Sequence, residues 1–187
     1  MIFITLGSQK FQFNRLIKKI DELVANEIFN DVIFAQIGYS DYIPKNYKYS
    51  NFLDQEKFKE YMKKSDIVIT HSGTGAIMSA IKAGKKTIVV PRLKKFEEHV
   101  DDHQIQIAKE FENLNLVVAC YDIEDLESKY TEIKNKKLDS YISNTETIIN
   151  CLDSFIKTTL IISKKPENTG ISRDIRTEFT TDLLLSD

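Results

Sequence analysis

Short apolar runs alternate along the chain with stretches in which apolar residues recur every three or four positions. The short runs predict buried strands at residues 1–6, 32–37, 47–53, 67–70, 87–90 and 116–120. The periodic stretches predict amphipathic helices at residues 13–24, 58–62, 76–83, 99–111 and 138–159. Asp54 is the expected N-cap of the second helix, and Gly84 is expected to end the third in a left-handed conformation.

The strands carry continuous apolar runs, whereas a sheet with one wet face would show alternating polar positions. This pattern predicts an α/β fold, a Rossmann-like parallel sheet with helices on both faces. Residues 1–162 are expected to form this domain, and residues 163–187, which lack periodicity, a poorly ordered tail or docking segment. The apolar stripe of the helix predicted at 138–159 fits either the chain's own sheet or a partner.

The composition excludes several classes of protein. The chain has 187 residues, of which 42% are hydrophobic and 29% charged, which fits a single soluble domain. No apolar run approaches the ~20 residues of a bilayer helix, and residues 1–6 resemble a core strand more than a signal peptide, so we expect a cytoplasmic chain. A net charge of −2 argues against nucleic-acid binding, and two cysteines, Cys120 and Cys151, are expected to be buried thiols.

The turns that follow the strands carry the candidate chemistry. Loops at the carboxyl ends of parallel strands line the ligand crevice, and here they are residues 7–9, 71–75 and 91–104. Because Gly73 and Gly75 lack side chains, the backbone N–H groups of Thr74, Gly75 and Ala76 can approach an anion such as a diphosphate at the helix N-terminus. Tight turns also need glycine for steric reasons alone, so both interpretations stay open. His71 fits either a phosphate contact or a structural histidine.

Charged residues cluster after the glycine turn. Six basic residues without an acidic one suggest a solvated surface, or a surface for a nucleotide or anionic lipid; they are Lys82, Lys85, Lys86, Arg92, Lys94 and Lys95. The histidines and acids of residues 97–104 indicate polar ligand recognition more than a metal site, because no cysteine accompanies them. The chain also lacks an Asp-x-Asp pair, a Walker A motif and a Gly-x-Ser-x-Gly elbow. We therefore expect no metal and no cofactor.

A composite of these motifs resembles a known family. Residues 65–75 (Ser-Asp-Ile-Val-Ile-Thr-His-Ser-Gly-Thr-Gly), Gly84, residues 89–91 and the pair His103-Gln104 resemble the donor-binding half of family-28 type GT-B glycosyltransferases. Residues 91–96 and 98–104 are similar to single-domain bacterial exopolysaccharide and capsule transferases. The catalytic subunit of the eukaryotic dolichol-linked N-acetylglucosamine transferase is a more distant relation. The resemblance covers about residues 1–155.

The resemblance implies a UDP-sugar donor. Its diphosphate would lie on residues 71–76, with His71 stabilising the leaving group, and its sugar hydroxyls would meet His103 and Gln104. A backbone contact to uracil is implied at Leu53, while Ser79 stands where many relatives carry a ribose-binding glutamate. The implied donor-binding residues are Gly7, Ser8, Leu53, Ser72, Gly73, Thr74, Gly75, Ala76, Ser79, His103 and Gln104.

The resemblance also implies a membrane-anchored partner subunit that binds the acceptor, since the other GT-B domain is missing. A hexose such as galactose would pass with inversion to a lipid-linked saccharide in surface polysaccharide synthesis, with the general base on the partner. The chain would then lie at the inner face of the membrane through that partner. Two alternatives remain, a non-catalytic nucleotide-sensing or scaffold subunit and a dinucleotide-dependent epimerase-like protein. The turn at residues 7–9 lacks the Gly-x-Gly-x-x-Gly spacing that the latter needs.

Overall fold

The computed structural model describes residues 1–143. Its centre is a six-stranded sheet with the spatial order β3-β2-β1-β4-β5-β6. Every neighbouring pair is parallel, which confirms the predicted Rossmann-like sheet. The strands are β1 (Ile2–Thr5), β2 (Ile33–Gln36), β3 (Lys48–Ser50), β4 (Ile67–His71), β5 (Lys86–Val90) and β6 (Val118–Ala119).

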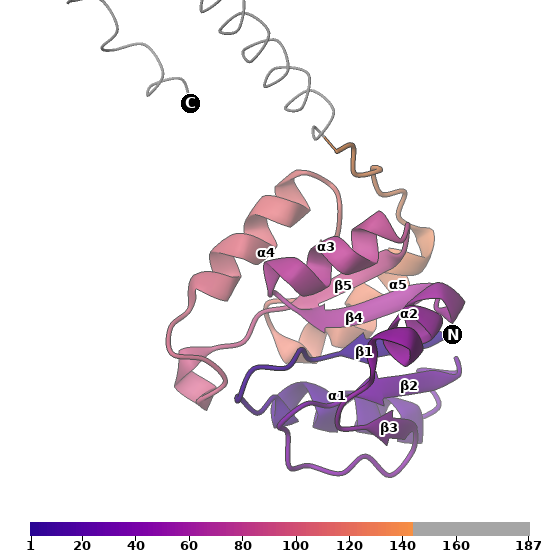
Figure 1. Ribbon diagram of the computed structural model, residues 1–187, viewed down its shortest axis with the longest axis vertical. Helices are drawn as coiled ribbons and strands as arrows, with labels where there is room; N and C mark the ends of the chain where they lie inside the picture. The colour runs from indigo at the N-terminus through magenta and orange to yellow at the C-terminus, as the bar shows by residue number, and fades with distance from the viewer. Residues whose placement is uncertain (144–187) are drawn as a thin grey trace, which may run out of the picture. The chain divides into compact units, whose positions relative to one another are not determined.

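Helices cover both faces of the sheet (Figure 1). Two of them, α1 and α5, pack on one face, and α2, α3 and α4 pack on the other. The α-helices are α1 (Asn14–Ala25), α2 (Gln55–Lys64), α3 (Thr74–Lys82), α4 (His103–Asn113) and α5 (Leu126–Asn135), and the short 3₁₀ helices are η1 (Lys94–Phe96) and η2 (Ile123–Asp125). None of the helices in residues 1–143 is both long and apolar enough to span a bilayer.

Successive strand residues alternate between two buried faces, which explains the continuous apolar runs. Ile2 and Ile4 of β1 belong to the cluster under α1 and α5. Phe3, between them, packs on the opposite face with Met62 of α2 and Ala80 of α3. Burial on both sides therefore replaces the apolar–polar alternation of a half-exposed sheet.

Two local signals are confirmed. The carboxylate of Asp54 accepts a hydrogen bond from the backbone N–H of Lys57 at 2.8 Å, so it caps α2 as predicted. Gly84, just after α3, has a φ of 67°, a conformation that a β-carbon would strain. These residues fix where the helices on the α2–α3 face begin and end.

The C-terminal part of the prediction is wrong where the structure describes it. Helix α5 was not predicted, although its buried residues Leu126, Tyr130 and Ile133 have helical spacing. The helix expected from residue 138 does not begin there, because residues 138–143 are not helical. Instead the backbone N–H of Asp139 donates to the carbonyl of Asn115 at 2.9 Å, which ties this segment to the loop after α4.

The remaining predictions for this part of the chain concern residues outside the described range. They are the rest of that helix, the domain boundary at 162, the tail 163–187 and Cys151. Cys120, in contrast, is described and is a buried free thiol as expected. Burial raises the pKa of this thiol to about 12, which leaves it unreactive at neutral pH.

Candidate functional site

The candidate site lies where the strand order reverses, between the carboxyl ends of β1 and β4. The chain leaves β1 for α1 on one face and leaves β4 for α3 on the other, and such a divergence opens a crevice in parallel sheets. A cleft of about 430 Å³ lies at this point. Its lining residues are Thr5, Gly7, Ser8, Gln9, Gln36, Phe58, His71, Gly73, Thr74, Gly75, Ala76 and Ser79.

The glycine turn, residues 72–76, forms one wall of the cleft and begins α3. Gly73 is the N-cap, and Thr74 and Gly75 are the first two helical residues, whose N–H groups have no acceptor within a helix. The N–H of Ala76 already donates to the carbonyl of Gly73 at 3.0 Å. The two amides at the helix start, with the positive end of the helix dipole, are therefore the anion-binding part of this wall.

The imidazole of His71 fills the space between two glycines. A β-carbon on Gly7 would lie 2.8 Å from Cε1 of His71, and one on Gly73 would lie 2.3 Å from Nε2. Both glycines are thus required by the packing of this ring, so the steric interpretation of Gly73 holds. Gly75 differs, since a β-carbon there would meet nothing within 4 Å.

Burial also sets the charge of His71. The residue is 8% exposed, and burial, with the nearby charge of Arg92, lowers its pKa to about 4. The imidazole is therefore neutral at neutral pH. A neutral ring carries one N–H donor, and the backbone of Thr5 forms a hydrogen bond with this ring. His71 can therefore donate into the cleft in the tautomer that releases Thr5, and it adds no formal charge.

Arg92 is a buried cationic residue near the cleft. It is 1% exposed, and one terminal nitrogen donates to the carbonyl of Leu6 at 2.8 Å, immediately before Gly7. Its Nε and other terminal nitrogen have no hydrogen-bond partner among the described residues. Burial lowers the pKa of Arg92 to about 10, so the side chain stays positive at neutral pH. It therefore places a positive charge near the cleft.

Gln104, at the start of α4, ties two strand ends together. Its side-chain oxygen accepts from the backbone N–H of Ser72 at 3.2 Å and from that of Arg92 at 3.1 Å. The residue is only 2% exposed. Gln104 therefore supports the backbone of the glycine turn, which the sequence did not reveal.

A buried ion pair holds the β5–α4 loop, residues 91–102. Glu98 is fully buried and accepts two hydrogen bonds from Arg15, at 3.0 and 2.9 Å, and one from the backbone N–H of Leu93 at 3.0 Å. Arg15 also donates to the carbonyl of Pro91 at 3.0 Å. This pair links α1 to the loop and fixes the loop beside the cleft.

The basic run noted in the sequence does not form one surface. Lys85 donates to the carbonyls of Lys63 and Ser65, both at 2.7 Å, and Lys86 donates to that of Lys134 at 2.6 Å. These lysines lie at the start of β5, whereas Arg92 is buried just after its end. This run therefore does not form one positively charged surface that could bind a nucleotide or a lipid membrane.

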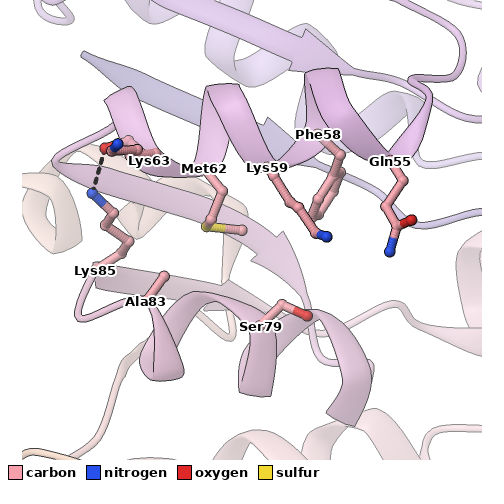
Figure 2. A pocket seen from close by; sticks show the side chains of 8 residues that line it. All are labelled: Gln55, Phe58, Lys59, Met62, Lys63, Ser79, Ala83 and Lys85. Atoms are coloured by element: carbon pink, nitrogen blue, oxygen red, sulfur yellow. Dashed lines mark hydrogen bonds between the residues drawn. The ribbon is translucent and has the colours of Figure 1, made fainter.

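A second cavity, of about 600 Å³, lies between α2 and α3. Figure 2 shows its lining, with Phe58, Lys59 and Met62 on α2 and Ser79 on α3. Phe58 and Ser79 line both cavities, so the two adjoin. The hydroxyl of Ser79 donates to the carbonyl of Gly75 at 2.7 Å and leaves its oxygen as an acceptor.

The structure brings most of the predicted site residues together. Eight line the cleft: Gly7, Ser8, His71, Gly73, Thr74, Gly75, Ala76 and Ser79. Four do not: Leu53 packs near Phe3 and Met62, Ser72 is buried, Gln104 ties two strand ends, and His103 contacts Asp101.

Three residues of the cleft, Thr5, Gln36 and Phe58, were not predicted from the sequence, whereas Gln9 belongs to the candidate loop 7–9. Thr5 and Gln36 end strands β1 and β2. A polar residue at the end of a buried strand is the sequence signal that could have identified them.

Comparison with known proteins identifies a family for this chain. Residues 1–159 match the family model of the glycosyltransferase family 28 C-terminal domain. A mouse protein named UDP-N-acetylglucosamine transferase subunit ALG13 is 27% identical over 134 residues, which is 63% of this chain. The chain spans only 10% of that relative's length.

Two solved structures share the fold. An ALG13 structure determined by NMR has a TM-score of 0.54 at 20% identity, over 76% of this chain and 89% of that one. A kitacinnamycin glycotransferase has a TM-score of 0.55 at 19% identity, over 72% of this chain and 35% of that one. At these identities the likeness shows the fold alone, and in the second case it covers about a third of a larger chain.

Proposed function

Because this chain belongs to the family of the glycosyltransferase family 28 C-terminal domain, we propose that it binds the nucleotide-sugar donor of a UDP-sugar-dependent glycosyltransferase. The observation that carries the proposal is the cleft between β1 and β4, with the start of α3 as one wall. A crevice at this point of a parallel sheet, with free helical amides, suits a nucleoside diphosphate.

The diphosphate lies in this proposal against Thr74 and Gly75. Charge that develops on it during transfer is stabilised by the helix start, the N–H of His71 and the positive charge of Arg92. These groups replace a bridging cation, so no metal ion is needed on the diphosphate. Among the described residues that line the cleft there is no pair of carboxylates with which to hold magnesium.

The nucleoside extends from the diphosphate toward Phe58 and Ser79, where the two cavities meet. The Ser79 oxygen accepts from a ribose hydroxyl in place of the family's glutamate, and the backbone at Leu53 contacts uracil. The sugar points the other way, toward α4, where the amide NH₂ of Gln104 and the ring of His103 donate to its hydroxyls. The donor is UDP-galactose or, as the name of the mouse relative suggests, UDP-N-acetylglucosamine.

The acceptor side comes from a second protein. The chain corresponds to a donor half, and the mouse relative is named as a subunit. A membrane-anchored partner supplies the acceptor site and the general base, holds this cytoplasmic chain at the inner face of the membrane, and presents a lipid-linked saccharide. Transfer inverts the anomeric centre, and in a bacterial setting the product is a surface polysaccharide.

The direct test is calorimetric titration of the full chain with UDP, UDP-galactose, UDP-N-acetylglucosamine and NAD in buffer with EDTA. We expect saturable UDP binding, tighter binding of one UDP-sugar, and none of NAD. Binding of NAD alone would support an epimerase-like protein, binding of none of the four a scaffold, and UDP binding only with added magnesium or manganese would contradict the proposed diphosphate site.

The need for a partner is tested separately. Membranes that contain the partner should transfer the sugar only when the purified chain is added. Robust transfer to a lipid-linked acceptor by the purified chain alone would contradict this part of the proposal.

A further inference from the structure

A cluster of three potential metal ligands lies in the β5–α4 loop, outside the cleft. His99, Asp101 and His103 each offer one ligand atom, and these atoms all lie within 4.8 Å of one another. The sequence argued against a metal here because no cysteine accompanies these residues. In the structure His103 begins α4 while the loop returns His99 to it, with ring centroids 4.7 Å apart.

His99 is held with one ring nitrogen facing this cluster. Its side chain is 8% exposed, and its ring lies 5.0 Å from the ring of Phe11. Nδ1 is buried and has no hydrogen-bond partner among the described residues. Burying a ring nitrogen without a hydrogen bond costs free energy. Because Nδ1 of His99 nevertheless faces a carboxylate, we interpret the arrangement as a site for a ligand.

The distances suit a small divalent ion. Nδ1 of His99 lies 3.4 Å from Oδ1 of Asp101. Zinc bonds of about 2.0–2.1 Å in tetrahedral geometry place two ligand atoms roughly 3.3 Å apart. Nδ1 of His103 contacts the same oxygen of Asp101, and the side chains of both residues are about half exposed. A small rotation of these two side chains can therefore make room for an ion in place of the proton between them.

We propose that His99, Asp101 and His103 form a binding site for a divalent transition metal such as Zn²⁺, with the fourth position open to solvent. Two imidazoles and one carboxylate favour zinc, cobalt or nickel over magnesium, which prefers oxygen ligands. Because this site lies outside the cleft, it is separate from the proposed diphosphate site, for which no metal is proposed. Coordination through Nδ1 fixes the remaining proton of His103 on Nε2, which stays an N–H donor.

This site has a structural consequence that is independent of the donor. Asp101 and His103 flank Asp102, the N-cap of α4, and the carboxylate of Asp102 accepts from the backbone N–H of Lys94 at 2.7 Å. An ion there ties the end of the β5–α4 loop to the helix that carries Gln104.

The test is calorimetric titration of ZnCl₂ into the tag-free, metal-stripped full chain, with variants at the two exposed ligands. We expect one ion per chain at micromolar affinity or tighter. Asp101→Asn and His103→Ala should each weaken binding at least about 10-fold. Glu97→Gln is the matched control, because Glu97 is an exposed neighbouring carboxylate outside the cluster, and it should bind like the parent.

Cobalt gives a second readout that does not depend on activity. Co²⁺ bound in a four-coordinate nitrogen–oxygen site absorbs visible light strongly, and we expect these bands in the parent and in Glu97→Gln but not in His103→Ala. Absence of stoichiometric Zn²⁺ binding would overturn the proposal. Equal binding by the parent, Asp101→Asn and His103→Ala would overturn it as well.

Discussion

The two loops that follow β4 and β5 lie at the same edge of the sheet but differ in where their polar groups point. The glycine turn directs backbone amides and exposed residues into the cleft. In the β5–α4 loop, Glu98 and Arg92 are buried and directed inward, as is Gln104 at the start of α4. The first region is built to meet a ligand and the second to hold the first in place. Substitutions in the glycine turn should accordingly reduce donor binding, and substitutions in the β5–α4 loop should reduce stability.

The largest loss of stability is expected at Glu98. Glu98→Gln removes the buried charge that pairs with Arg15, and breaking such a pair costs about 3 kcal/mol or more. Urea unfolding measures this loss, and Glu97→Gln, an exposed neighbour, should stay within about 0.5 kcal/mol of the parent. A loss below about 1 kcal/mol for Glu98→Gln would mean that this pair does not hold the loop.

The next effect is a pH dependence that originates at His71. Its pKa is lowered to about 4 in the folded chain, whereas the pKa of a solvent-exposed histidine in an unfolded chain is about 6.5. The unfolded state therefore binds more protons in this window, and stability falls as pH drops from 6.5 to 4, by up to about 3 kcal/mol. Arg92 and His99 are the charged or titratable groups that lower this pKa alongside burial.

The measurement is urea unfolding at pH 7 and pH 4.5 of the parent and of His71→Asn. The variant should lose less stability between the two pH values, even if it is weaker at both. An identical pH-dependent loss would assign the titration to other groups.

Gln104→Ala should cost about 2 kcal/mol of stability, because two buried backbone N–H groups lose their acceptor. Gln106→Ala is a control on the same helix. A loss below about 0.5 kcal/mol would contradict the support role.

The same variant tests the proposed sugar contact when it remains folded. UDP-sugar should then lose several-fold more affinity than UDP. An equal loss for both ligands would mean that Gln104 does not face the sugar.

The smallest effects are expected at the two glycines of the turn, where one substitution should change mainly stability and the other mainly UDP binding. Gly73→Ala places a β-carbon against His71 and should cost about 1–2 kcal/mol. Gly75→Ala meets no atom within 4 Å, so its stability should change by less than about 0.5 kcal/mol while UDP affinity falls. Thermal unfolding and calorimetric titration of both variants measure this. Unchanged UDP affinity in Gly75→Ala would argue against a diphosphate at the helix start.

Local signals predicted much of the fold. The apolar run of β4, the cap at Asp54 and the stop at Gly84 all depend on neighbours within a few residues, and the structure confirms them. The segment at 138–143 failed because its backbone is fixed by Asn115, more than twenty residues earlier. Periodicity cannot reveal such a bond.

The site shows the same division. The turn after β4 was visible because glycines after a strand have a local meaning. The packing of His71 against Gly7 and the bond from Gln104 to Ser72 join distant parts of the chain. No rule of sequence spacing predicts such long-range contacts, so the roles of Gly73 and Gln104 could not be decided from the sequence.

The most direct test of the donor site is an NMR titration of the uniformly ¹⁵N-labelled chain with UDP in EDTA. The amide resonances of Ser8, Thr74 and Gly75 should shift in a saturable way, while those of Glu97 and Val100 in the β5–α4 loop should stay nearly unchanged. Saturable shifts confined to the β5–α4 loop, or no shifts at any UDP concentration, would contradict a nucleotide site between β1 and β4.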